Sequence, residues 1–131
     1  MAEPDVLRKR RADVRRRELI LALEQWAPAF RDVAGDVLRY VAEIAEATEP
    51  ERTWLREHVA AHGLPTGPAR TADDLRAAGR RANAEASAAF LAGDYDRARD
   101  LIDEARAHGA LFEAEWERLH AFITAQAPKR P

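Results

Sequence analysis

Residues 19–44 have the sequence LILALEQWAPAFRDVAGDVLRYVAEI, in which bulky apolar side chains recur at alternating intervals of four and three residues. This spacing places them along one stripe of an α-helix and is typical of a seam at which two helices pack. Because the stripe must be shielded from water, it decides how the rest of the chain folds. The recurring positions are Leu19, Leu23, Trp26, Phe30, Val33, Val37, Tyr40 and Ile44.

Pro28 lies inside this seam and interrupts its hydrogen bonding. A proline has no N–H group, so the carbonyl of Glu24 loses its helical partner. However, the residues next to Pro28 are alanines, which do not form loops readily, and the apolar spacing continues unbroken. We therefore predict one long helix over residues 18–47 that is kinked at Pro28, with two helices meeting there as the alternative.

The chain after the seam carries clear signals for helix starts and stops. Thr48 and Glu51 have the spacing of a capping box, in which each side chain accepts a hydrogen bond from the backbone N–H of the other residue. Asp94 directly follows Gly93, a pattern typical of one helix ending and the next beginning. These signals predict four further helices, near residues 49–62, 72–92, 94–108 and 110–126.

The composition favours an entirely helical fold. Of the 131 residues 29 are alanine, the strongest helix former, and no stretch has the pattern of a strand. We predict an all-α bundle of five or six helices that forms one domain over residues 1–131. Its predicted parts are a basic N-terminal arm (1–17), the long amphipathic helix (18–47) and the remaining helical bundle (48–131).

Residues 82–105 have the pattern of a closely packed helical hairpin, with alanines on both predicted helices and a Gly-Asp-Tyr turn between them. The positions that carry the pattern are Ala86, Gly93, Asp94, Tyr95, Ala98, Ile102 and Ala105. They resemble one tetratricopeptide repeat, and the resemblance implies a hairpin of two antiparallel helices. No second copy follows at the period of that family, whereas a repeat array needs about three copies to bury its faces. We therefore expect a single hairpin of this type inside a bundle.

Charge is distributed unevenly along the chain. Residues 8–17 carry seven positive charges and one negative, whereas the chain from Glu18 onward has 20 acidic and 14 basic residues. Such a block can bind an acidic protein face, a nucleic-acid backbone or an anionic lipid surface. The net charge of −2 argues against a dedicated nucleic-acid binder. The candidate partner-binding residues in the block are Arg8, Arg10, Arg11, Arg15, Arg16 and Arg17.

Tryptophans and histidines suggest two further candidate sites. Trp26, Trp54 and Trp116 can line a pocket for a flat apolar ligand, with ordinary core packing as the alternative. His58 and His62 are four residues apart, so on a helix both rings point to one side and can ligate a metal. Such a site needs further ligands from another helix. Stabilisation of the negative end of the helix by these histidines is the structural alternative.

Several classes of site are excluded by the residues that are missing. Cysteine is absent, which removes disulfides, thiolate nucleophiles and cysteine-based metal sites. There is no glycine-rich phosphate loop, no run of about 18 apolar residues for a membrane span, and no secretory signal. We expect a cytoplasmic protein of bacterial composition, since 19 of its 21 basic residues are arginine.

These observations favour binding over catalysis. We predict a protein-interaction domain with an adaptor or regulatory role and without a cofactor. Its most concrete form is a homodimer through residues 19–44, with Val33 and Val37 at the contact. One alternative is a small-molecule or metal-dependent enzyme that uses His58 and His62. The other is a nucleic-acid accessory protein that uses the Arg8–Arg17 arm.

Overall fold

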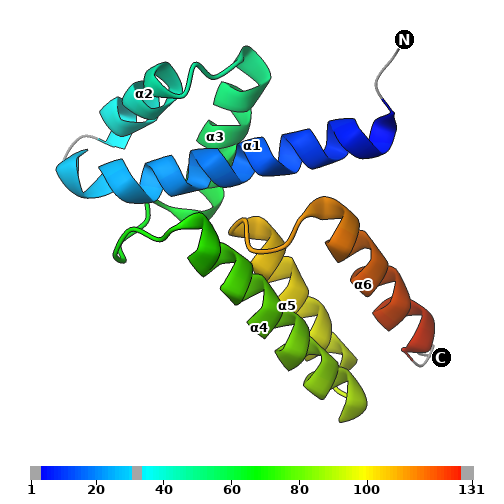
Figure 1. Ribbon diagram of the computed structural model, residues 1–131. Coiled ribbons are helices and arrows are strands. Elements are labelled where there is room, and N and C mark those ends of the chain that lie inside the picture. The colour runs from blue at the N-terminus through cyan, green and yellow to red at the C-terminus, as the bar shows by residue number, and fades with distance from the viewer. Residues whose placement is uncertain (1–3, 31–33, 128–131) are drawn as a thin grey trace. The chain divides into compact units, whose positions relative to one another are not determined.

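The computed structural model describes residues 4–30 and 34–127, apart from the side chains at 34 and 35 (Figure 1). Within these residues it contains six α-helices, one 3-10 turn and no strand, which confirms the predicted all-α class. The four helices predicted after the seam are all present, with ends within one turn of those expected. The elements are α1 (Asp5–Trp26), the 3-10 turn (Ala27–Phe30), α2 (Ala34–Ile44), α3 (Glu49–His62), α4 (Ala72–Leu91), α5 (Tyr95–Ala107) and α6 (Glu113–Gln126).

The chain divides into two compact units, each with its own apolar core. Unit 1 comprises the described residues of Met1–Val14 and Asp73–Pro131, and unit 2 comprises those of Arg15–Ala72. The division therefore falls inside α1 and at the start of α4. The single domain over residues 1–131 stays a prediction.

Unit 2 buries part of the apolar seam in its own core, whereas Ile44 at the end of the seam is 47% exposed. Leu19 and Leu23 of α1 form one buried cluster with Val37 and Val41 of α2 and with Leu55 of α3. None of these five side chains is more than 1% exposed. Val37 is therefore a core residue of the single chain, and Val33 lies outside the described residues. The buried part of the seam is thus covered by its own chain, and a homodimer through residues 19–44 stays a prediction.

The seam folds onto itself because α1 ends before Pro28. The α-helix stops at Trp26 and a 3-10 turn follows, so two helices replace the single kinked helix that we predicted over residues 18–47. Pro28 has no N–H for the carbonyl of Glu24, and its ring disfavours a helical backbone at Ala27. A break at this point lets α2 turn back onto α1 (Figure 1), which buries apolar surface that a kinked helix would expose.

An ion pair between buried Glu24 and half-buried Arg70 holds the end of α1 against the segment that precedes α4. Glu24 is only 4% exposed. Arg70 donates from Nε to Oε1 and from Nη2 to Oε2 of Glu24, each at 2.8 Å, and its backbone N–H donates to Oε1 at 3.3 Å. This bidentate arrangement compensates for the burial of the carboxylate.

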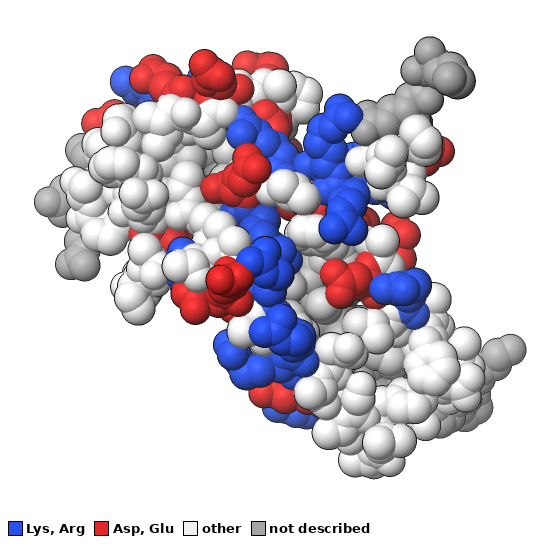
Figure 2. All heavy atoms as spheres, in the orientation of Figure 1, with Lys and Arg blue, Asp and Glu red and all other residues white. Residues whose placement is uncertain are grey.

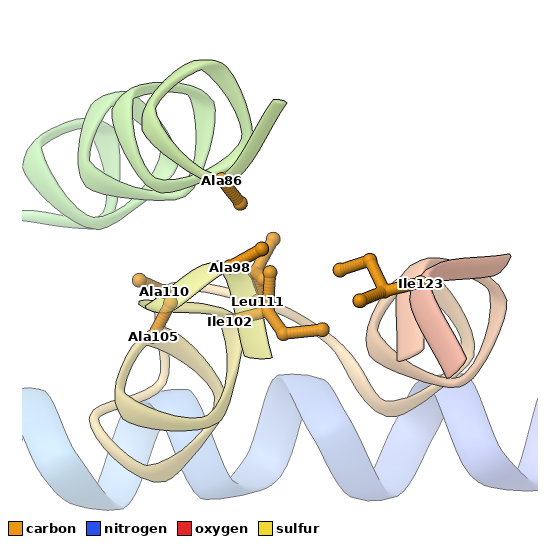
Figure 3. Close-up of a cluster of buried hydrophobic side chains, with 7 residues drawn as sticks. All are labelled: Ala86, Ala98, Ile102, Ala105, Ala110, Leu111 and Ile123. Atoms are coloured by element: carbon orange, nitrogen blue, oxygen red, sulfur yellow. The ribbon is translucent and has the colours of Figure 1, made fainter. Parts of the chain in front are cut away.

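Unit 1 packs the small side chains of α4 against α5 and α6 (Figure 3). The predicted turn after α4 is confirmed: Gly93 has a φ of 81°, and the Asp94 side chain accepts a hydrogen bond from the backbone N–H of Arg97 at 3.2 Å. A helical hairpin is therefore present, and its kinship with tetratricopeptide repeats stays a prediction. The buried residues of this core are Ala86, Ala98, Ile102, Ala105, Ala110, Leu111 and Ile123.

The first half of α1 belongs to unit 1 through a buried carboxylate. Asp13, which is 7% exposed, accepts a hydrogen bond from the backbone N–H of Glu113 at 3.1 Å. The N-cap residue of α6, Phe112, offers no side-chain hydrogen bond of its own, so Asp13 supplies the cap from 100 residues away in the sequence. The negative charge also complements the dipole of α6. The predicted N-terminal arm is therefore helical from Asp5 and is anchored at Asp13.

Gly79 of α4 sets how closely this helix approaches the segment before α6. A Cβ atom at this position would lie 2.3 Å from the carbonyl oxygen of Ala110, a backbone atom that cannot simply rotate away. We expect Gly79→Ala to lower the free energy of unfolding by about 1–3 kcal/mol through overpacking, although alanine favours helix. Urea unfolding followed by circular dichroism measures the change.

Gly67→Ala is the matched control, because a Cβ atom at Gly67 would meet no atom within 4 Å and no positive φ is involved. This variant should be neutral or slightly stabilised. Equal stabilities of the two variants would contradict the close approach at Gly79.

Candidate functional site

A cleft of unit 2 between α2 and α3 combines arginines with an apolar floor. It has a volume of about 300 Å³. Leu38 and Ala42 of α2 and Leu55 of α3 provide the apolar lining, and three arginines complete it. These arginines are Arg39 of α2 and Arg52 and Arg56 of α3.

Local sequence fixes the two walls of the α2–α3 cleft. Glu46 takes a left-handed backbone with a φ of 51°, and the N–H of Ala47 bonds the carbonyl of Ala42 at 2.9 Å, which closes α2. The predicted capping box then starts α3. Glu51 accepts from the backbone N–H of Thr48 at 2.8 Å, and Thr48 accepts from that of Glu51 at 3.4 Å. The turn is short, so α2 and α3 pack as neighbours.

Arg39 and Arg56 of the cleft make few contacts with other residues. Arg39 lies 3.6 Å from Asp36, and Arg56 lies 3.2 Å from the Thr53 hydroxyl and 3.9 Å from Glu49. The side chains of Arg39 and Arg56 are 71% and 57% exposed, so these ion pairs contribute little stability. A guanidinium has five N–H donors, and these contacts use only one or two of them. The cleft can therefore accept an anionic group in bidentate geometry.

Arg52 differs from the other two because it also supports the turn. Its Nε donates to the carbonyl oxygen of Ala47 at 3.2 Å. The rest of the guanidinium can still face an anion in the cleft.

Arg15 of α1 makes hydrogen bonds that connect the three helices of unit 2 near the turn between α2 and α3. It donates to Glu51 of α3 at 2.8 Å, to Glu18 of α1 at 3.1 Å and to the carbonyl oxygen of Ala45 after α2. Burial alone would lower the pKa of Arg15, but the hydrogen bonds and charges of Glu51 and Glu18 outweigh it and the pKa is raised. Burial would likewise raise the pKa of Glu51, but hydrogen bonds from Thr48 and Arg15 lower it. Arg15 is therefore part of the fold of one chain.

The other arginines of the basic block also lie on α1, where Lys and Arg side chains gather in Figure 2. Arg8 pairs with Asp5, and the Arg16 guanidinium lies 5.9 Å from the centre of the Trp54 ring. Arg10 and Arg11 are exposed, and Arg17 is half-buried. Some arginines of the basic block therefore make contacts within the fold, and others lie at the surface.

The candidate tryptophans pack against the cores of their own units. In unit 2, Trp26 meets Tyr40 edge-on with ring centres 5.0 Å apart. In unit 1, Trp116 donates from Nε1 to Asp103 at 2.7 Å, and the centre of its ring lies 3.7 Å from Cζ of Arg106. A pocket shared by the three tryptophans stays a prediction.

His58 and His62 lie together on α3, as their spacing predicted. Their ring centres are 4.9 Å apart, and His58 stacks on Trp54. In the part of the chain that the structure describes, no group of three or more potential ligands gathers around them or elsewhere. The pair by itself supplies two ligands, which is fewer than a zinc site uses.

Sequence reasoning missed the α2–α3 cleft, although two signals for it were present. Arg52 and Arg56 are four residues apart directly after a recognised capping box, which places them on one face of a helix. The strong preference for arginine over lysine is the other signal, since arginine binds carboxylates and phosphates in bidentate geometry. Arg39 could not be added without knowing that α2 turns back.

Comparisons with protein-family models, with curated proteins and with solved structures found no match to this chain. Across residues 4–30 and 34–127, none of the helices has the length and apolar character needed to cross a membrane.

The lowered pKa of Glu51 predicts an acid-dependent contribution to stability. Because the pKa of the folded state lies below that of the unfolded state, ionised Glu51 stabilises unit 2 above the unfolded pKa, and this contribution is lost as the pH falls through the folded pKa. We expect Glu51→Gln to lower the free energy of unfolding by about 1 kcal/mol near neutral pH. The deficit should shrink toward zero in acid, which urea unfolding at a series of pH values measures.

Glu57→Gln is the control, since Glu57 is an exposed residue of the same helix. It should change stability little at any pH. A deficit of Glu51→Gln that stays constant down to about pH 3 would contradict the proposed role of the ionised carboxylate.

Proposed function

We propose that this chain is a non-enzymatic protein-interaction domain that binds an acidic segment of another protein in the α2–α3 cleft. The observation that supports the proposal most is that three arginines and three apolar residues line one cleft of unit 2. The cleft offers positive charge and aliphatic surface together, which are the two features that an acidic amphipathic segment requires.

The lining of the cleft favours binding over reaction. Leucine, alanine and arginine are its only residue types, and none of them is a nucleophile or a general base at neutral pH. A volume of about 300 Å³ is at the lower limit of small-molecule pockets, so the cleft accommodates a few side chains more readily than a whole cofactor.

The same lining favours a protein over a nucleic acid. Single-stranded nucleic acids are bound by aromatic side chains that stack on the bases, along a basic groove. The α2–α3 cleft has no aromatic residue in its lining, and its floor is aliphatic. Aliphatic surface next to guanidinium groups instead matches an apolar side chain with carboxylates beside it.

Titration with a short poly-glutamate peptide tests this function. We expect backbone amide shifts in nuclear magnetic resonance spectra to change at residues 38–42 and 52–56. The double variant Arg39→Gln/Arg56→Gln should bind roughly tenfold more weakly, because two charge-assisted contacts are lost. Arg52 is left unchanged because it also supports the turn.

Arg80→Gln/Arg81→Gln is the matched control, with the same loss of charge at two exposed arginines of unit 1. It should bind the peptide as the unmodified protein does. Shift changes confined to Arg8–Arg17, or equal affinities of the two double variants, would contradict the proposed function.

A further inference from the structure

The walls of the α2–α3 cleft place a restriction on the conformation of its occupant. The lining residues lie within α2 and α3, where backbone N–H and C=O groups bond one another along the helix. An extended peptide can add to an open sheet edge, and a proline-rich segment can dock in an aromatic-lined groove, but the lining of this cleft offers neither. A helical occupant satisfies its own backbone and presents only side chains to the cleft.

The spacing of the arginines matches a helix. Arg52, Leu55 and Arg56 are at positions i, i+3 and i+4 of α3 and therefore share one face. Arg52 and Arg56 are about 6 Å apart along the helix axis. Two carboxylates four residues apart on another helix have the same separation, and a side chain between them projects from the same face.

The floor of the cleft defines the third contact. Leu38 and Ala42 are one turn apart on α2, and with Leu55 they form the apolar lining between the arginines. Ala42 and Leu55 are only 3% and 1% exposed, so Leu38, which is half-buried, is the apolar residue that an occupant can contact. Arg39, beside Leu38 on α2, faces the occupant from the opposite wall to Arg52 and Arg56.

We infer that the cleft takes an amphipathic helix with the pattern Glu-x-x-Leu-Glu, or its aspartate equivalent. The two carboxylates pair with Arg52 and Arg56, and the leucine packs against Leu38. Arg39 pairs with a further acidic group on the other side of the occupant. This inference rests on the proposed function and specifies the partner of the same cleft.

Three fluorescein-labelled peptides of equal charge test the inference with the full chain. The first is an alanine-based peptide of about 20 residues, which exceeds the ~12–15 residues below which isolated helices are marginal in water, and it carries the pattern once. The second replaces the leucine by serine, and the third keeps the leucine but has a proline at its centre. Fluorescence anisotropy should show the first peptide binding at least about tenfold more tightly than either of the others.

A charge exchange tests the pairing itself. Arg56→Glu should weaken binding of the first peptide roughly tenfold. A peptide with lysine in place of the second glutamate should bind this variant more tightly than it binds the unmodified protein. Arg80→Glu, on unit 1, is the control and should show no such exchange.

The outcomes separate the inference from the proposed function. If all three peptides bind equally and Arg39→Gln/Arg56→Gln weakens all of them, the cleft binds acidic segments but the helical occupant is wrong. If neither these peptides nor poly-glutamate binds, both proposals fail. Self-association that the double variant abolishes, without peptide binding, would identify a second copy as the occupant and overturn the inference. Tighter binding of a single-stranded oligonucleotide of equal charge would overturn both.

Discussion

The packing of α1 against α2 across the break at Pro28 is the contact on which the rest of unit 2 depends. Leu19 and Leu23 lie on one side of it, and Val37 and Val41 lie on the other. Because these side chains share one buried core with Leu55 of α3, α2 stands beside α3 instead of extending α1. The α2–α3 cleft exists only in this arrangement, since its lining comes from both helices.

Polar contacts fix these apolar surfaces at defined points. In unit 2, Arg15 from the middle of α1 joins three helices near the turn between α2 and α3, and the ion pair between Glu24 and Arg70 holds the C-terminal end of α1. In unit 1, Asp13 caps α6 from a distant part of the sequence. Each of these groups is charged and at least partly buried, which is costly without a partner. Their pairing therefore specifies which helices meet.

Local signals in the sequence predicted the helices well. The features that the sequence did not predict depend on long-range contacts. The capping box at Thr48 and the turn at Gly93 depend on neighbouring residues, so they could be recognised in the sequence. The effect of Pro28 could not be recognised in the sequence, because the apolar spacing is the same for one kinked helix and for two helices that fold together. The burial gained by folding back decides between them. The close approach at Gly79 and the position of Arg39 likewise depend on contacts between separate elements.

Isotope-filtered nuclear Overhauser spectroscopy on a mixture of labelled and unlabelled chains tests the central claim most directly. The folded-back seam predicts contacts among the methyl groups of Leu19, Leu23, Val37, Val41 and Leu55 within one chain, and none between chains. Contacts that appear only between differently labelled chains would show that the seam is closed by a partner. In that case α2 would not lie against the α1 of its own chain, and the cleft between α2 and α3 would lose its structural basis.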